Sequence, residues 1–198
     1  EENAADCVPY LVGNYNGTSF YLIVDRDAIA LTTKSNEVAY CGTADDNGEA
    51  PTWTNITNIQ GNTPSTAAVA SSIAIDAHAA ILELYNFGFS IPTGATIYGV
   101  AVTIDGTGSE ADVIINEINL LKDGTTGTQI GALKRNEQDM NRTDNDFGGD
   151  CDMWGMTLTP AEVNDTGFGV RIECENDEGS GTLDAHVRLA KITVYYRD

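Results

Sequence analysis

Basic residues are scarce in this chain of 198 residues: ten Lys and Arg face thirty Asp and Glu, which gives a formal net charge of -20. A surface that binds DNA or RNA needs a basic stripe to release the counterions of the phosphates, and no such stripe occurs. Anionic membranes are disfavoured for the same reason. The charge therefore argues against nucleic acid and membrane as partners, and favours a particle or secreted protein whose surface repels its neighbours.

Long apolar runs are missing as well. The longest apolar region, residues 67–85, is interrupted by Asp76 and His78, so no transmembrane span is expected. No signal peptide is visible. Because the chain begins at Glu1 and not at Met, we expect a processed or trimmed form, from which a leader has been lost if one existed.

Motifs of catalysis are absent: there is no G-x-S-x-G elbow, G-x-G-x-x-G loop or P-loop. The two histidines sit in identical tripeptides, Asp76-Ala77-His78 and Asp184-Ala185-His186. Residues i and i+2 of a strand share a face, so paired strands would bring two carboxylates and two imidazoles together as a metal site. We favour two unrelated surface pairs, and predict a protein that is not an enzyme and has no cofactor.

The four cysteines, Cys7, Cys41, Cys151 and Cys174, are too few for a disulfide scaffold and lack the close C-x-x-C pairs of a zinc site. They allow three connectivities. The simplest joins nearest neighbours, Cys7 to Cys41 and Cys151 to Cys174. Bridges are expected outside the cell, and ordinary buried thiols otherwise.

The best metal candidate is the acidic stretch Thr143–Asp152, which repeats part of the opening of a calcium loop. It departs from that loop at Gly148, where Asp or Asn is usual, and Gly155 stands where the closing Glu would be. The calcium hypothesis is therefore set against a plain solvated acidic loop, which we favour; residues 45–49 form a second acidic cluster. The candidate ligands are Asp144, Asp146, Asp150 and Asp152.

Glycine is frequent, with 20 residues, and Thr, Asn and Asp recur between short apolar runs, which is typical of an all-β protein. Residues 95–105 and 111–125 have the length and composition of core strands. Residues 166–176 alternate apolar and charged side chains, and so do residues 186–197. These segments predict an antiparallel, jelly-roll-like β-sandwich.

Two segments have helical features. Residues 76–87 fit a helix and a strand about equally well, and periodicity cannot decide between them. Thr159-Pro160-Ala161-Glu162 is a capping box with Pro at the first helical position, which predicts one helical turn.

The N-terminal quarter differs from the rest: short strand-like runs at residues 19–33 and 37–42 are followed by a polar break at 43–53. We interpret residues 1–50 as an N-terminal arm or hairpin and residues 51–198 as the sandwich domain.

Several motifs follow one another along the second part of the chain, residues 51–198. They are W-x-N at Trp53, FGFSIPTGATIYGVAV from Phe87, LLKDGT from Leu120, DMWGMTLTPAEVNDTGFGVRI from Asp152 and ITVYY from Ile192. In this order they resemble a domain common in virion proteins of tailed phages, across about residues 51–198. The resemblance implies a jelly-roll-like sandwich used as a capsid decoration or tail appendage on the virion surface, with the extra arm anchoring it. IPxGA turns before a strand also occur in bacterial and archaeal surface proteins.

Three functions follow as hypotheses. The first is a non-enzymatic structural protein of a virus particle, a homo-oligomer docked on other virion subunits through its arm. The second is a subunit of an extracellular filament or adhesin at the cell surface, which donates SFYLIV, residues 19–24, to a neighbouring sheet edge. The third is a carbohydrate-binding module or enzyme for surface glycans, stacking sugars on aromatics such as Tyr15, Trp53 and Tyr98. A sandwich can host all three.

Overall fold

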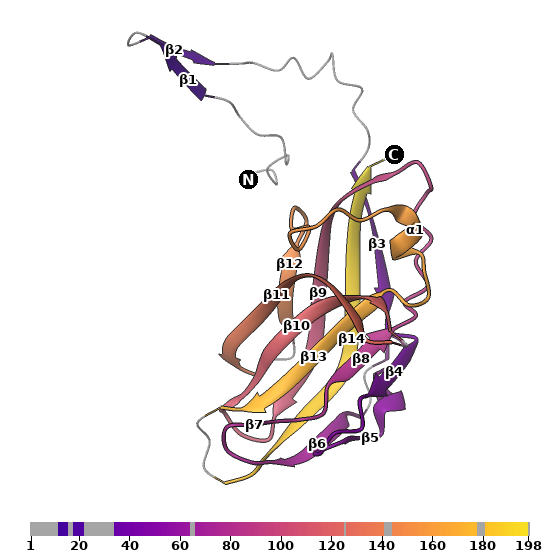
Figure 1. Cartoon of the computed structure of the whole chain (residues 1–198), viewed down its shortest axis with the longest axis vertical. Coiled ribbons are helices and arrows are strands. Elements are labelled where there is room, and N and C mark those ends of the chain that lie inside the picture. The colour runs from indigo at the N-terminus through magenta and orange to yellow at the C-terminus, as the bar shows by residue number, and fades with distance from the viewer. Residues whose placement is uncertain are drawn as a thin grey trace. The chain divides into compact units, whose positions relative to one another are not determined.

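The computed structural model describes residues 12–15, 18–21, 34–63, 66–124, 126–140, 144–177 and 181–197. The chain divides into two compact units, Glu1–Thr33 and Lys34–Asp198 (Figure 1). Within the described ranges, no helix has the length and apolarity needed to cross a membrane.

The first unit contains an antiparallel hairpin of two short strands, β1 (Val12–Tyr15) and β2 (Thr18–Tyr21). Asn16-Gly17, which separates the strands in the sequence, is a preferred dipeptide of two-residue hairpin turns.

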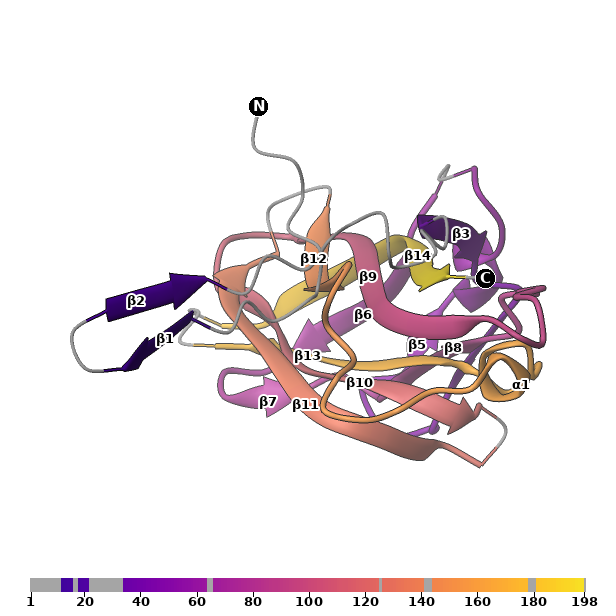
Figure 2. The ribbon, with the colours of Figure 1, turned by 90° about the horizontal axis from the view of Figure 1, so that it is seen from above.

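The second unit is a sandwich of two antiparallel sheets, and Figure 2 shows the layers one above the other. Sheet I has the order β12-β9-β14-β6-β5, and β3 also pairs with β14. Its strands are β3 (Lys34–Tyr40), β5 (Trp53–Thr54), β6 (Ala68–Ile73), β9 (Thr96–Gly108), β12 (Asn145–Gly149) and β14 (Leu183–Arg197).

Sheet II has the order β11-β10-β13-β8-β4, and the short strand β7 pairs with β13. Its strands are β4 (Thr43–Asp46), β7 (Ala77–His78), β8 (Leu82–Tyr85), β10 (Val113–Asp123), β11 (Thr128–Asp139) and β13 (Gly169–Asn176). The predicted all-β antiparallel sandwich is confirmed.

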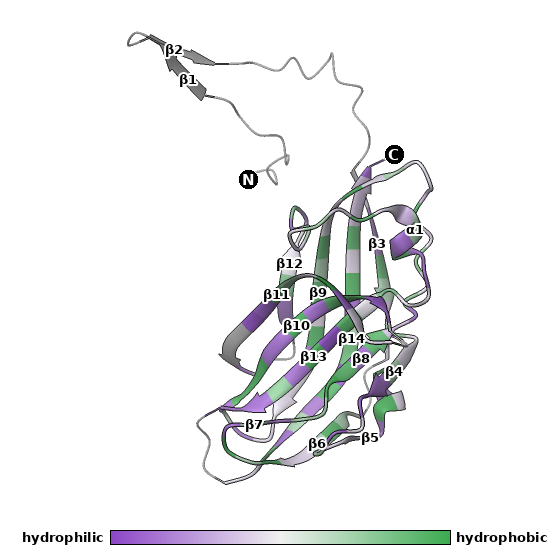
Figure 3. Cartoon of the chain, viewed as in Figure 1, coloured by the Kyte–Doolittle hydropathy of each residue, from purple (hydrophilic) through white to green (hydrophobic). Residues whose placement is uncertain are grey.

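The core lies between the sheets and follows the predicted alternation, which Figure 3 shows as alternating colours along the strands. In β13, Val170, Ile172 and Cys174 are fully buried, and the charged residues between them are half-buried. Along β14 the buried positions change from odd-numbered to even-numbered residues, because its register with β9 shifts between Val187 and Leu189. The bulge lets one long strand serve two stretches of the core.

The structure shows which of the two segments with helical features is a helix. Residues 76–87 are not helical: they form β7 and β8, which both pair with β13. The capping box at Thr159 is confirmed, because its hydroxyl accepts a hydrogen bond from the Glu162 N–H and the Glu162 carboxylate accepts one from the Thr159 N–H. The resulting helix α1 spans Pro160–Val163, and a 3₁₀ turn, η1, spans Ile56–Ile59.

The domain boundary predicted at residue 50 is wrong, because the sandwich begins at Lys34. The strand expected at residues 37–42 forms as part of β3 and pairs with β14, and β4 pairs with β8. The polar break expected to be a linker is fastened at Trp53, whose indole N–H donates to the Ala80 carbonyl at 2.7 Å. These contacts join residues far apart in sequence, so composition alone does not reveal them.

One side of the sandwich is closed by Trp154, which is fully buried. Its indole N–H donates to the Val100 carbonyl of β9 at 3.0 Å, and its own carbonyl accepts from the Ala132 N–H of β11 at 2.6 Å. Gly148, with φ at 74°, leaves room for the ring, since a Cβ there would meet the Val100 carbonyl and the indole nitrogen. A single residue therefore ties β9 of sheet I to the edge strand β11 of sheet II.

The outer side of Trp154 is covered by Lys134, whose Nζ lies 4.8 Å from the ring centroid and 2.6 Å from an Asp152 carboxylate oxygen. Burial raises the pKa of Asp152, but the hydrogen bonds from Lys134 and the Trp154 N–H, with the Lys134 charge, outweigh it and hold the pKa below its ordinary value of 3.8.

Replacing Trp154 with Ala is expected to lower the free energy of unfolding by about 3–5 kcal/mol, because a large aromatic leaves a cavity in the core. Urea denaturation followed by circular dichroism measures the loss. As a control, Leu133→Ala, at an exposed position, is expected to stay within about 0.5 kcal/mol of the native chain. Equal stabilities of the two variants would refute the role given to Trp154.

Replacing Lys134 with Met is expected to lower stability at neutral pH by removing the partner of the Asp152 carboxylate. Because the pKa of Asp152 is lowered on folding, this contribution is complete above its ordinary value of 3.8 and is lost as the pH falls through the folded value. Urea denaturation across this pH range should show the gap between the two proteins closing. Lys191→Met, which removes a cation with no ion-pair partner among the described residues, should show no such convergence.

Candidate functional site

The two Asp-Ala-His tripeptides lie in different sheets. His78 belongs to β7 of sheet II, and its Nδ1 lies 3.7 Å from the carboxylates of both Glu173 and Glu175. His186 belongs to β14 of sheet I. The Asp184 carboxylate accepts a hydrogen bond from the Ser72 N–H. The combined metal site considered from the sequence is therefore not formed.

The four candidate calcium ligands do not converge either. Asp146 accepts a hydrogen bond from the Thr103 hydroxyl at 2.6 Å, and Asp152 is paired with Lys134. Asp144 and Asp150 are exposed. In the part of the chain that the structure describes, no three His, Cys, Asp or Glu side chains are close enough to hold a metal ion.

The second acidic cluster, residues 45–49, has a structural role. The Asp46 carboxylate accepts hydrogen bonds from the N–H groups of Gly48 and Trp53, and the Asn47 side-chain oxygen accepts from Ile81. These bonds hold the loop that brings Trp53 into the core.

The predicted nearest-neighbour disulfides are wrong, because Cys41 and Cys174 are both free thiols with no exposed surface. The Cys41 thiol donates to the Thr43 carbonyl at 3.0 Å, and Cys174 contacts the sulfur of Met140 at 3.7 Å. Cys7 lies outside the described residues. Sequence spacing misled here, because Cys41, directly after β3, and Cys174, on β13, are each buried among groups that include no other cysteine among their hydrogen-bond partners.

The aromatic side chains considered for sugar stacking are already engaged. Trp53 is buried, with 6% of its surface exposed. The Tyr98 ring lies 6.4 Å from that of Tyr195, and the Arg197 guanidinium lies 5.3 Å from the Tyr98 ring centroid. The side chain of Tyr15 is not among those that the structure describes.

Two hollows of about 450 and 520 Å³ share Asp123 and Asp165 in their walls. Their other lining residues are mostly polar, and Tyr85 contributes the aromatic surface. Its phenol pKa is raised by burial and by nearby acids, of which Asp45 and Glu83 act most strongly. The hollows are therefore acidic depressions near the turn between β10 and β11.

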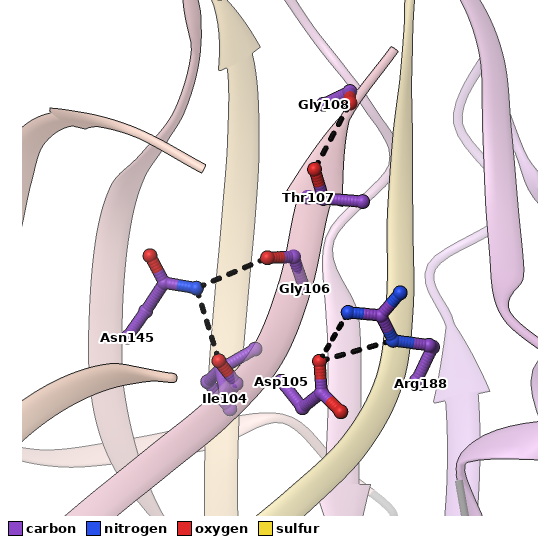
Figure 4. Close-up of polar contacts among 7 residues, drawn as sticks. All are labelled: Ile104, Asp105, Gly106, Thr107, Gly108, Asn145 and Arg188. Atoms are coloured by element: carbon purple, nitrogen blue, oxygen red, sulfur yellow. Dashed lines mark hydrogen bonds and ion pairs between the residues drawn. The ribbon is translucent and has the colours of Figure 1, made fainter. Parts of the chain in front are cut away.

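Strand edges are the remaining places where a partner can bind, and most are closed. On the Trp154 side, β11 has four register shifts against β10, and its Ala132 N–H is bonded to Trp154. Strand β12 has only five residues, and its first, Asn145, donates from its side-chain amide to the carbonyls of Ile104 and Gly106 on β9 (Figure 4). Figure 4 also shows the Arg188 guanidinium donating to Asp105 across β14 and β9.

On the opposite side, β4 and β5 have four and two residues, and the hydrogen bonds of Asp46 and Asn47 fasten the loop between them. Such short strands offer a partner little backbone to pair with.

Strand β3 is different, because it pairs with β14 over seven consecutive positions without a bulge. No described strand pairs with its other side, which we call the free edge of β3, residues 35–40. This strand has no proline, and its Val38 is 47% exposed. Natural edges are normally protected by bulges, prolines or charges. The charge in the middle of this edge, Glu37, is engaged, because its carboxylate accepts a hydrogen bond from the Ser90 N–H at 3.0 Å. A long regular edge with an exposed valine beside it favours a partner strand.

The free edge was missed by sequence reasoning, which assigned β3 to the arm. The alternation of Val38 and Tyr40 indicates a strand, but a strand at the edge of a sheet has no local signal of its own.

Comparisons with known proteins leave the chain without a family. No protein-family model matches it, and no curated protein matches it. Among solved structures, it is similar to the CBM36-1 domain of a multidomain xylanase from the hindgut metagenome of Trinervitermes trinervoides. The identity is 14% and the TM-score 0.30, over 80% of this chain and 96% of that chain. At that score the likeness carries no argument about function.

The thiols of Cys41 and Cys174 are expected to resist alkylation in the folded protein and to react once it is unfolded. Burial raises the pKa of each thiol to about 12, so almost no thiolate is present at about pH 8, and the reagent cannot reach the sulfur. Iodoacetamide labelling with peptide mass mapping, with and without urea, measures this. Rapid labelling of either residue in the native protein would contradict the burial described.

Proposed function

We propose that this protein is a non-enzymatic structural subunit that joins neighbouring subunits of an extracellular assembly through the free edge of β3. The observation that carries the proposal is that edge, the one described strand of the sandwich that is long and regular but paired on one side only. Adding a strand there satisfies backbone groups that are otherwise left to water, and it covers Val38.

The kind of assembly follows the sequence hypotheses. A virus particle is the first candidate, because the motifs from Trp53 to Tyr196 resemble a domain of tailed-phage virion proteins. An extracellular filament or adhesin is the second, and a specific feature favours it: the separate unit Glu1–Thr33 directly precedes β3 and supplies the hairpin that strand donation requires.

Electrostatics support recognition through backbone and not through charge. With a net charge of -20, copies of the chain repel one another at long range, which suppresses random association. Backbone pairing at this edge, whose outward-facing centre is the apolar Val38, gives a specific contact that this repulsion does not abolish, and salt strengthens it by screening.

Carbohydrate binding is less well supported. Of the aromatics proposed for stacking, Trp53 is buried and Tyr98 is packed against Tyr195, and no observation on the described surface favours a sugar ligand over other polar molecules.

Replacing Val38 with Lys is expected to weaken self-association of the full chain by about tenfold or more, since a charged side chain at the centre of an edge opposes strand addition. The fold should not change, because the side chain is half exposed. Light scattering after gel filtration, with electron microscopy of the assemblies, gives the measurement.

The matched control is Leu133→Lys, which places the same charge at an exposed apolar position of β11. It should assemble like the native chain. The proposal fails if Val38→Lys assembles as well as Leu133→Lys, or if the native chain stays monomeric at high concentration and in the source material.

A further inference from the structure

We infer, building on the proposed function, that the strand added to the free edge of β3 is formed by residues 18–24, which begin with β2 (Thr18–Tyr21), of a second copy of this chain. Each chain would thus carry both a donor strand and an acceptor edge.

The donor follows from the strand pairings. In one chain, β2 has β1 as its described partner and β3 has β14, so each strand keeps one side without a described strand. A two-stranded hairpin is marginally stable in water, whereas three or more strands are stable. Adding β2 to β3 places the hairpin on a large sheet and completes both edges at once.

The sequence of the donor suits burial at such an edge. Residues 18–24, TSFYLIV, contain no charge and five apolar or aromatic side chains in succession. Left in water, such a run is an aggregation hazard, and natural proteins cover it or break it with charges. Because β3 has seven residues, a donor strand of residues 18–24 would pair with it along its whole length.

Antiparallel pairing of the two segments end to end gives a definite register. Phe20 then lies opposite Val38, the exposed apolar residue at the centre of the edge. Thr18 lies opposite Tyr40, and Asp25, the first charge after the donor, follows the position opposite Lys34. This register pairs apolar Phe20 with Val38 at the centre and brings the opposite charges of Asp25 and Lys34 near each other at one end. It places no two like charges directly opposite each other.

The connection allows the donor to reach a neighbour. Residues 25–33 separate it from β3, and nine residues span at most about 30 Å when extended. Because donor and acceptor are different surfaces, the contact is head to tail. Repeating it produces a closed ring, of which the reciprocal dimer is the smallest, or an open filament.

A complementation experiment with full-length chains tests the inference. The donor variant carries Phe20→Lys and Leu22→Lys, and the acceptor variant carries Val38→Lys. Each variant alone should be a monomer of about 21.1 kDa. Mixed in equal amounts they should form a complex of doubled mass, because the acceptor variant still donates its strand and the donor variant still offers its edge. Analytical ultracentrifugation should show association of the mixture at least about tenfold tighter than of either variant alone.

The other outcomes separate this inference from the proposed function. If the donor variant assembles like the native chain while the acceptor variant does not, the edge pairs with something else, such as β3 of a second copy, and the inference is overturned while the proposed function stands. If the acceptor variant assembles normally, both are overturned. If the native chain is monomeric and only the donor variant associates, the segment covers β3 of its own chain and both are again overturned. Unchanged circular dichroism of each variant establishes that the sandwich is intact.

Discussion

The burial of Trp154 between the two sheets is the contact on which the shape of the sandwich depends. The tryptophan connects the two sheets: its indole donates to β9, and its carbonyl accepts from β11. Gly148 makes room for the ring, and Lys134 covers it while holding Asp152. The same contacts satisfy the Ala132 N–H of the edge strand β11, so packing and protection against unwanted partners have one cause at this edge.

The edges of the sandwich are not protected equally, and one of them differs from the others. The edges beside Trp154 are bonded or irregular, and β4 and β5 are too short to recruit a partner, whereas β3 is long, regular and paired on one side. The net charge of -20 also limits association, because repulsion between copies disfavours contacts that lack specific hydrogen bonds. Together these features support the proposal that the molecule associates through the free edge of β3.

Several of the groups that the sequence offers as candidates for chemistry have structural roles. Two cysteines are buried thiols whose raised pKa values keep them protonated, and the histidines stand on different sheets. Among the acids, Asp46, Asp146 and Asp152 accept hydrogen bonds from loops, from a strand neighbour or from Lys134. A residue type that suggests a ligand or a catalyst in the sequence is therefore used here to fasten loops and close edges.

Local patterns were sufficient wherever the interaction itself is local. The alternation of Val170, Ile172 and Cys174 predicted a half-buried strand, and Thr159 with Glu162 predicted a helical turn, because each depends on residues a few positions apart. The sequence by itself thus determined the antiparallel sandwich class and the acidic surface. Tertiary structure decided that residues 76–87 are strands, that the sandwich begins at Lys34, that Cys41 and Cys174 stay unpaired and that β3 keeps a free edge. Each of these depends on which distant strand lies alongside, and backbone pairing between distant segments leaves almost no trace in the order of side chains.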